Sequence, residues 1–291
     1  MNNTLTLTVA ANMTANYGES LGNISTIQTI QKDGKTYACR SRESLKNAIM
    51  NISHFEDDLK TTAENKVASK YVGKDYTLAE SKALEGGYML TSGGTKTRTS
   101  SFQITDAVSI VPFNADYQFH NNLGLATKTA KQKGINVQEK ATECGLMPYN
   151  YEFSKDMKVY SLTIHLDEIG VDEGFDIEIS NEDKCERVLC LLDSIKNLSL
   201  LVRGSLDNAE PLFIVGGLVE NYRHEFENSV KIKNNKILIF DDFVEKVSNG
   251  CHAGIYGETF ENELEVKQKL NATSINQFFN TIKEEVKEYY K

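Results

Sequence analysis

Alternating and helical hydrophobic patterns divide this chain into a clear series of elements. Leu5, Leu7 and Val9 alternate with polar residues, which is typical of a half-buried strand. Ser41 is an N-cap residue type, and the apolar stripe that follows it predicts a helix. The main elements that we expect are strand 5–13, helix 41–53, strand 101–111, strand 158–168, helix 184–199 and strand 211–216. This β-α-β-β-α-β order predicts an α+β fold of ferredoxin-like type, the order that RNA-recognition (RRM) domains also use.

Turn and cap signals add three local predictions. Asp33-Gly34 predicts the turn of a hairpin whose arms are residues 24–31 and 36–40. Asn234-Asn235 predicts a second hairpin within residues 229–240. A capping box at Ser274-x-x-Gln277 begins the C-terminal helix.

Two long segments interrupt the expected core. Residues 54–100 are polar and mixed in charge, and their end, TSGGTKTRTSS (91–101), has the composition of an exposed mobile loop or ribbon. Residues 112–156 have no regular pattern and contain a cluster of lysines, Lys128, Lys131 and Lys133. The core then consists of 1–53, 101–111 and 157–291, with 54–100 and 112–156 as insertions.

Composition excludes several classes of protein. The 291 residues are 40% hydrophobic and 25% charged, as in ordinary globular chains. No apolar run approaches the roughly 20 residues of a membrane span, and MNNTLTLTVA lacks the basic residues of a signal peptide. We therefore expect a cytoplasmic protein without membrane contact.

The net charge of −9 is unevenly distributed. Residues 1–150 hold 16 Lys and Arg against 14 Asp and Glu, a net charge of +2, whereas residues 151–291 hold 16 against 27, a net charge of −11. Local charge decides where an anion binds, so an anionic ligand should meet the first half.

Motifs for cofactor or metal chemistry are missing from the sequence. The five cysteines include no C-x-x-C pair, so we expect reduced, mostly buried thiols and neither a zinc site nor disulfides. Neither G-x-x-x-x-G-K-[ST] nor G-x-G-x-x-G occurs, and no G-x-S-x-G marks a nucleophile. We expect no cofactor and no resident metal. The eight acids between Asp167 and Asp183 suit a solvated acidic face better than a divalent-cation site.

The basic residues suited to an anionic partner are few but close together in sequence. Arg40, Arg42 and Lys46 gather at the start of the helix expected after Ser41, and helix N-termini hold phosphates well. Lys96 and Arg98 stand in a segment with no acid between Glu85 and Asp106, and Ser100 and Ser101 add hydroxyl donors. Ordinary surface lysines and arginines are the competing interpretation.

Five segments, in order, resemble a known family. They are NYGESLGNIST (16–26), TYACRSRESLKNAI (36–49), GYMLTSGGTKTRTSSFQITDAVSIVPF (87–113), VYSLTIHLDEIGV (159–171) and PLFIVGG (211–217). Together they resemble the DevR-type CRISPR-associated backbone subunit of type I-B Cascade complexes, in the Cas-seven superfamily. Residues 54–85 and 218–291 add little to the resemblance.

The resemblance implies a non-catalytic subunit with an RRM-like palm and inserted finger and thumb segments. The palm would be 1–53, 101–111 and 157–291 with C-terminal additions, 54–100 the finger-like insertion, and 112–156 the second insertion and the candidate for the thumb. Copies of such subunits form a helical filament along CRISPR RNA. The guide pairs with target DNA, so base pairing and not this protein reads the sequence. Other Cascade subunits and a recruited helicase-nuclease are the further partners implied.

The resemblance also carries over a set of RNA-binding positions. Four lie in the segments that resemble the family's palm and first helix, and two lie in segment 87–113, which resembles a basic Arg–Ser step of the family. Two serines are weaker candidates. These residues are Asn16, Arg40, Arg42, Lys46, Lys96, Arg98, Ser41 and Ser101.

Two other functions stay open at this point. One is an RNA-cleaving or guide-processing nuclease, with Asp57 or Asp58 holding a metal or with His54 or His120 as general acid or base. The other is a structural interaction protein without RNA binding, whose acidic C-terminal half docks a basic partner.

Overall fold

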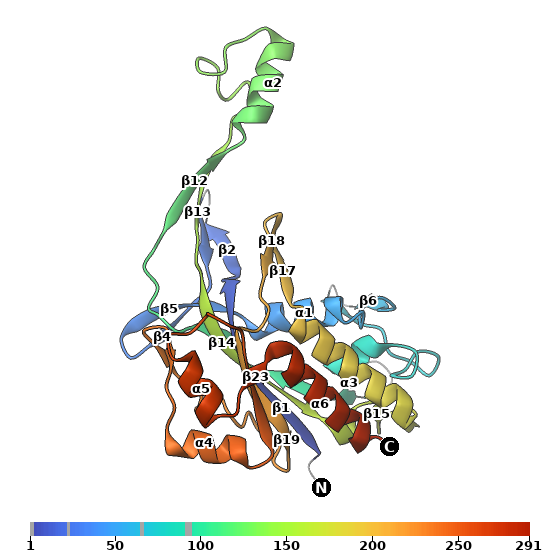
Figure 1. Ribbon diagram of the computed structural model, residues 1–291. Helices are drawn as coiled ribbons and strands as arrows, with labels where there is room; N and C mark the ends of the chain where they lie inside the picture. The colour runs from blue at the N-terminus through green and yellow to red at the C-terminus, as the bar shows by residue number, and fades with distance from the viewer. Residues whose placement is uncertain (1–2, 22–23, 65–66, 91–94) are drawn as a thin grey trace.

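A nine-stranded sheet forms the centre of the chain in a computed structural model, which describes residues 3–21, 24–64, 67–90 and 95–291 (Figure 1). Eight strands follow the order β23-β22-β19-β1-β14-β11-β5-β4, and β10 also pairs with β14. Their bounds are β1 Thr4–Thr14, β4 Thr29–Lys32, β5 Lys35–Arg40, β10 Phe102–Ile104, β11 Ala107–Ser109, β14 Lys155–His165, β19 Phe213–Val219, β22 Cys251–Ile255 and β23 Thr273–Ser274.

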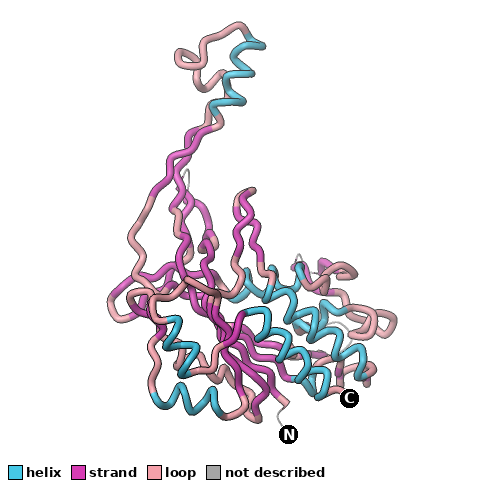
Figure 2. Tube along the Cα trace, in the orientation of Figure 1, coloured by secondary structure: helices cyan, strands magenta, loops and turns pink. Residues whose placement is uncertain are grey.

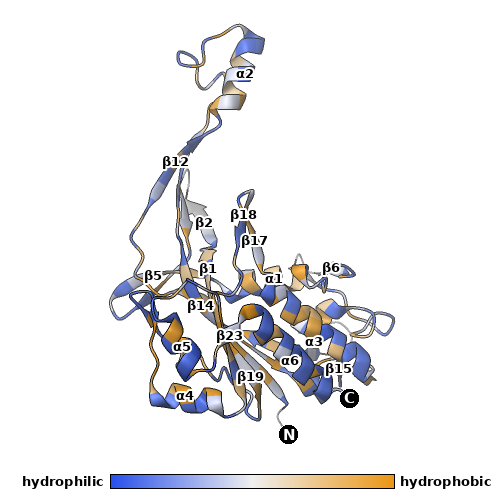
Figure 3. Cartoon of the chain, in the orientation of Figure 1, coloured by the Kyte–Doolittle hydropathy of each residue, from blue (hydrophilic) through white to orange (hydrophobic). Residues whose placement is uncertain are grey.

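Helices cover both faces of this sheet (Figure 1). Leu5, Leu7 and Val9 of β1 are fully buried on the face covered by α1 (Arg42–Ile52), α3 (Asn181–Lys196) and α6 (Ile275–Tyr289). Phe213 and Val215 point to the other face, which α4 (Asp241–Ser248) and α5 (Glu263–Lys269) cover. Figure 3 shows hydrophilic residues on the exposed turns of α3 and α6, so the helices are amphipathic as their apolar spacing requires.

The predicted α+β class is confirmed, and four of the six main elements lie close to their expected bounds. Both hairpins turn where expected, with Asp33 and Gly34 at φ 50° and 71°, and Asn234 and Asn235 at φ 49° and 55°. The second hairpin joins β20 (Ile232–Lys233) to β21 (Lys236–Ile237). The capping box at Ser274 is present in full.

Two expected strands have different limits in the structure. The strand expected over 101–111 is divided into β10 and β11, because Thr105 and Asp106 leave the ladder to accept hydrogen bonds from the backbone N–H groups of Ser161 and Arg42. The strand expected over 158–168 ends at His165, and a 3-10 helix, η2 (Leu166–Glu168), follows it.

The irregular structure expected for 112–156 is wrong. This segment is a two-stranded stalk, β12 (Tyr117–Asn121) and β13 (Pro148–Glu152), with α2 (Leu123–Lys133) at its tip (Figure 2). At its base β13 pairs with β3 (Ile24–Ile27), which pairs with β2 (Tyr17–Leu21). The expected hairpin arm 24–31 is therefore divided between two sheets.

The stalk escaped prediction because neither of its faces is buried. Gln118, His120 and Asn121 are half-buried or exposed, like most of β12 and β13. At the tip, α2 buries only Ala126 and Ala130, against Cys144. The strands alternate over only five residues each, with Tyr117 and Phe119 in β12 and Tyr149 and Tyr151 in β13, and so short a pattern without a buried face is a weak strand signal.

Residues 54–100 contain two short hairpins in their described part. They are β6 (Thr61–Glu64) with β7 (Val67–Lys70), and β8 (Tyr88–Leu90) with β9 (Lys96–Arg98), separated by the 3-10 helix η1 (Lys82–Gly86). Of the expected mobile loop 91–101, residues 91–94 lie outside the described residues, and Ser100 and Ser101 are buried. The expectation of a ribbon is confirmed for Lys96–Arg98, whereas the expected exposure is wrong for Ser100 and Ser101.

The acidic run 167–183 is not wholly a solvated face. Asp172 is 2% exposed and accepts hydrogen bonds from the Tyr88 hydroxyl at 2.8 and 3.0 Å. Burial and this carboxylate raise the pKa of Tyr88 above its ordinary value. The run continues through β15 (Val171–Asp172) and β16 (Ile177–Glu178).

All five cysteines are free thiols, and three of them are buried. Among the described helices, none combines the length and hydropathy needed to cross a membrane.

Gly216 on β19 has no room for a side chain against β1. A Cβ at this position would lie 2.0 Å from the backbone oxygen of Thr6 on β1. We expect Gly216→Ala to lower the free energy of unfolding by at least about 2 kcal/mol, because a ladder atom must move. Gly124→Ala on α2, where a Cβ meets nothing within 4 Å, is the control and should lose nothing. Thermal unfolding compares the two variants, and equal melting temperatures would contradict this account.

Candidate nucleic-acid interface

The N-terminus of α1 is tied to two neighbouring segments. The Ser41 side chain caps the helix by accepting from the Ser44 backbone N–H at 3.3 Å. Asn16 accepts from the Ser41 N–H at 2.7 Å, and Asp106 accepts from the Arg42 N–H at 2.7 Å. These helix-end amides therefore already have protein acceptors, and an anion here must be held mainly by side chains.

Arg42 is the exposed cation at this helix end. Its side chain is 63% exposed, and its Nε lies 2.8 Å from a carboxylate oxygen of Glu43. The hydrogen bond to Glu43 raises the pKa of Arg42, so the guanidinium stays charged. An exposed pair of this kind is weak, which leaves Arg42 free to exchange its partner for a phosphate.

Arg40, in contrast, is buried. It is 5% exposed, donating to the backbone oxygen of Thr14 at 3.1 Å and to the Ser44 hydroxyl at 2.8 Å. Burial lowers the pKa of Arg40, and Asp207 opposes that shift. Arg40 thus fixes the end of β1 against α1.

Lys46 lies one turn further along α1 in a half-buried position. Its ammonium donates to the Ser100 hydroxyl at 2.8 Å and to the Gly86 carbonyl at 3.1 Å, and lies 4.8 Å from the centre of the Phe102 ring. Burial lowers the pKa of Lys46 to about 8, and the nearby charge of Lys70 adds to the effect. Keeping Lys46 protonated in the folded chain therefore costs free energy, and a bound anion would reduce that cost.

Lys70 and Arg98 complete a group that we call the Lys46 cluster, consisting of Lys46, Lys70 and Arg98. Lys70 donates to the Ala83 carbonyl at 2.6 Å. Burial, together with the charge of Arg98, lowers the pKa of Lys70. The cluster thus brings together three cations, one each from α1, β7 and β9. Sequence reasoning missed Lys70, because only the β6–β7 hairpin brings it next to α1.

Arg98 and Ser101 belong to a buried network centred on Glu85, which is fully buried. Arg98 lies 2.9 Å from one carboxylate oxygen of Glu85, and Arg187 of α3 lies 2.8 Å from the other. The Ser101 hydroxyl and the Gly170 N–H donate to the same carboxylate at 2.6 and 2.9 Å. The Arg98 guanidinium also donates to backbone carbonyls, at 2.8–2.9 Å to those of Leu84, Val171 and Glu168.

The predicted residues therefore lie in three places. Asn16, Arg40, Ser41 and Arg42 meet at the N-terminus of α1, and Lys46, Arg98 and Ser101 lie beside η1. Lys96 lies apart from both groups, 3.9 Å above the Phe175 ring and bonded to the Gly174 carbonyl.

An aromatic row that runs along the stalk was missed entirely. The His120 ring stacks on Tyr151 at 4.5 Å and on Tyr149 at 5.7 Å, and Tyr151 meets Tyr17 edge to face at 5.9 Å. The Arg203 guanidinium lies 4.0 Å from the centre of the Tyr17 ring. The sequence signal that could have revealed this row is the Tyr-x-Tyr spacing at 149 and 151. This spacing puts both rings on one face of a strand.

The two histidines proposed for nuclease chemistry lie in different parts of the chain. His54 pairs with Asp57 at 3.0 Å, both well exposed, whereas His120 belongs to the aromatic row. Within the described residues, His, Cys, Asp and Glu form no group of three or more that could hold a metal ion.

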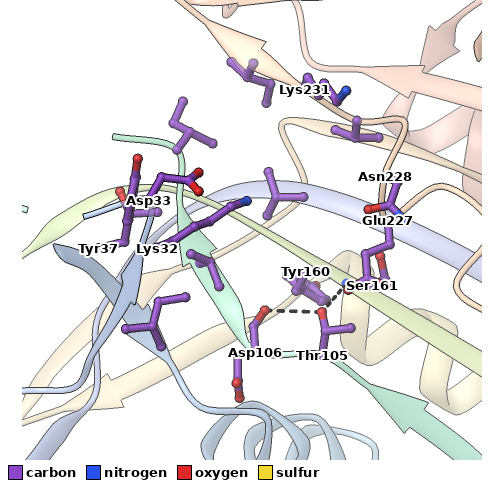
Figure 4. A pocket seen from close by; sticks show the side chains of 17 residues that line it. Lys32, Asp33, Tyr37, Thr105, Asp106, Tyr160, Ser161, Glu227, Asn228 and Lys231 are labelled. Atoms are coloured by element: carbon purple, nitrogen blue, oxygen red, sulfur yellow. Dashed lines mark hydrogen bonds between the residues drawn. The ribbon is translucent and has the colours of Figure 1, made fainter. Parts of the chain in front are cut away.

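A pocket of about 540 Å³ lies elsewhere, between the β4–β5 hairpin and residues 227–232 (Figure 4). None of the eight predicted residues lines it. Its lining includes two lysines against three acids, Lys32 and Lys231 against Asp33, Asp106 and Glu227. This balance does not favour an anionic ligand.

Comparison with solved structures defines the class of fold. A chain of a structure titled "CRISPR RNA-guided surveillance complex, pre-nicking" matches with a TM-score of 0.60 at 10% identity, covering 96% of this chain and 100% of that one. A chain of a "CRISPR RNA-guided surveillance complex" matches with a TM-score of 0.54 at 12% identity, covering 96% and 99%. At these identities the likeness shows a shared fold along nearly the whole chain.

The family is shown by sequence. The family model described as "CRISPR-associated negative auto-regulator DevR/Csa2" matches residues 5–248, and the chain belongs to this family. The resemblance to DevR-type subunits is thereby confirmed. No curated protein matches the chain in sequence.

Proposed function

We propose that this chain is a non-catalytic, guide-RNA-binding backbone subunit of a type I CRISPR interference (Cascade) complex, of type I-B. Copies of the chain assemble along CRISPR RNA and present it for pairing with target DNA. The observation that carries the proposal is the Lys46 cluster beside the exposed Arg42, in a chain of the DevR/Csa2 family. Phosphates are the anions that such a cluster suits.

The sheet topology supports an RRM-like palm. Its central strands follow the order β19-β1-β14-β11, with antiparallel neighbours throughout, and α1 and α3 lie on one face. This arrangement matches the β-α-β-β-α-β order read from the sequence. In the proposal the palm is 1–53, 101–111 and 157–291, the finger is 54–100 and the thumb is 112–156, whose stalk carries α2 away from the sheet (Figure 1).

The predicted RNA-binding residues divide into two roles in this proposal. Arg42 and Lys46 contact phosphates directly, with Lys70 added to them. Asn16 and Ser41 hold the end of α1, Arg40 fixes it from inside, and Arg98 and Ser101 act through Glu85. Lys96 contacts the RNA backbone only further along the finger.

The acidic half faces the remaining partners. Residues 151–291, with net charge −11, would repel RNA and so favour protein contacts with other Cascade subunits or the recruited helicase-nuclease. The proposal places the protein in the cytoplasm, away from membranes.

Titration of labelled single-stranded RNA with the purified chain tests this function. The logarithm of affinity should fall linearly with the logarithm of salt concentration, with a slope of about one per phosphate contact. Absence of binding at low salt would overturn the proposal. Metal-dependent cleavage lost on changing Asp57 or Asp58, or chelator-resistant cleavage lost on changing His54 or His120, would replace it with a nuclease.

The pH dependence of binding provides a separate prediction. Only protonated Lys46 attracts a phosphate, and its pKa in the free chain is lowered to about 8. RNA affinity should therefore weaken as pH rises from 7 to 9, and binding near pH 8 should take up a proton. Lys46→Arg, which stays charged, should remove most of this dependence. An unchanged pH profile in that variant would contradict the role of Lys46.

A further inference from the structure

Two ammonium groups of the Lys46 cluster meet at Gly86, the last residue of η1. Lys46 donates to the Gly86 carbonyl at 3.1 Å, and Lys70 donates to the Ala83 carbonyl at 2.6 Å, one turn earlier. A Cβ built on Gly86 would lie 3.0 Å from the Lys70 Nζ, so both ammonium groups lie beside this glycine. Lys46, Lys70 and Gly86 are all only partly buried, so small solutes can reach them.

The positive charge of this pair is not balanced by a bonded carboxylate. The hydrogen-bond acceptors given above for the two ammonium groups are neutral carbonyl and hydroxyl oxygens. Glu85, the carboxylate within η1, is paired with Arg98 instead. Glu43 and Glu56 attract the two lysines, but burial outweighs them, and the pKa of each lysine stays lowered. A small anion with a phosphate group therefore meets an attractive site here.

The hydrogen bonds of Lys46 also suit its neutral form. The Ser100 hydroxyl donates to the Phe102 carbonyl at 2.6 Å, so its oxygen accepts from the Lys46 Nζ at 2.8 Å. The Gly86 carbonyl can only accept as well. A neutral amine has two N–H groups and one lone pair. The two acceptors take both N–H groups and leave the lone pair of Nζ free to attack an electrophile.

The protonation of Lys46 agrees with this geometry. Burial lowers the pKa of Lys46 to about 8, and the charge of Lys70 adds to the effect. About half of the Lys46 side chains are then neutral at pH 8, whereas an ordinary lysine with a pKa of about 10.4 is less than ~1% neutral. Desolvated lysines beside a second cation are the ones that act as nucleophiles in proteins.

We propose that Lys46 is a modification site, acylated by acyl phosphates in the RNA-free chain, and that acylation prevents RNA from binding at the Lys46 cluster. The consequence for RNA rests on the proposed function and adds regulation to the same site. An acyl phosphate carries its carbonyl next to its phosphate group, so Lys70 attracts the phosphate while Lys46 reaches the carbonyl.

The reaction is a simple acyl transfer. The Nζ lone pair forms a C–N bond to the carbonyl carbon, and the C–O bond to the phosphate breaks. Inorganic phosphate leaves with that electron pair, and the surplus proton of the amine passes to water. The product is a neutral amide, which can no longer form a charge-assisted contact with an RNA phosphate.

Acetyl phosphate is the probe for the modification. The full chain, free of RNA, would be treated at pH 8 and digested, and the occupancy of each lysine followed by mass spectrometry. Lys46 should react at least about fivefold faster than the exposed Lys233 and Lys236, since its neutral fraction is larger. Prior binding of oligouridylate should slow the reaction of Lys46 severalfold and leave the two control lysines unchanged.

The effect on RNA binding is measured on the same samples. Treatment stopped before Lys233 and Lys236 react should weaken oligouridylate binding at least about tenfold, as expected for one lost charge-assisted contact. Lys46→Arg cannot be acylated at this position under these conditions. Its affinity should therefore change less than about twofold relative to its own untreated form.

The outcomes separate this inference from the proposed function. If Lys46 reacts no faster than Lys233 and Lys236, or if Lys70 reacts first, this inference fails alone. If uncharged N-hydroxysuccinimide acetate shows the same preference for Lys46, the cluster attracts no phosphate group and acyl phosphates are the wrong donors. Equal loss of RNA binding in Lys46→Arg would overturn the regulatory role.

A remaining result bears on the proposed function itself. If the untreated chain binds no oligouridylate, the proposed function fails, and the effect on RNA fails with it. Faster acetylation of Lys46 than of the control lysines would still establish the modification site in that case.

Discussion

Glu85→Gln is expected to lower the free energy of unfolding by about 3–5 kcal/mol, the largest effect of any conservative change considered. The amide keeps the shape of the side chain but removes the charge that Arg98 and Arg187 share. Two guanidinium groups are then buried without a counter-ion, because Arg98 and Arg187 are 7% and 4% exposed at their side chains. Denaturant unfolding followed by circular dichroism measures the loss.

Glu186→Gln is the matched control. Glu186 also pairs with a cation, Lys82 at 3.0 Å, but its side chain is 61% exposed. Solvent screening should limit the loss there to about 0.5 kcal/mol. A loss below about 1 kcal/mol for Glu85→Gln would show that the buried network does not hold the finger to α3.

Lys46→Met together with Lys70→Met is expected to weaken RNA binding by at least about a hundredfold at low salt. Two charge-assisted phosphate contacts would be lost, each contributing roughly 1.5–3 kcal/mol. The salt slope should fall by about two units, the signature of lost phosphate contacts. The double variant should fold well, because burial lowers the pKa of both lysines and methionine relieves that cost.

Lys233→Met together with Lys236→Met removes the same charge from the β20–β21 hairpin. Both residues are exposed, and Lys236 lies 3.4 Å from Glu261. This control should bind RNA almost normally with an unchanged salt slope. Equal losses in the two double variants would mean that overall charge, and not the Lys46 cluster, governs binding.

Local sequence signals predicted the core of this fold well. Alternation in β1, the Asp33-Gly34 turn and the Ser274 capping box each depend on neighbouring residues, so short windows suffice to find them. The stalk was not predicted, because β12 and β13 are short strands that bury neither face. The division at Thr105 and Asp106 also escaped prediction, since it depends on hydrogen bonds to Ser161 and Arg42 far along the chain.

The candidate site was only partly visible in the sequence. Clustering in sequence identified Arg42 and Lys46, whose positions on α1 agree with the expected helix. It could not show that Arg98 faces the buried Glu85, because an exposed arginine and a buried one look alike in sequence. Lys70 and Arg203 reach the site through tertiary contacts between hairpins, which no local pattern encodes.

Co-purification with a CRISPR array tests the central claim most directly. The chain would be expressed with the array and its neighbouring subunits, sized, checked for its 260/280 absorbance ratio, and any bound RNA sequenced. The account predicts array-derived RNA of uniform length in a particle containing several copies of the chain. An RNA-free single chain under these conditions would contradict it and favour the structural interaction protein.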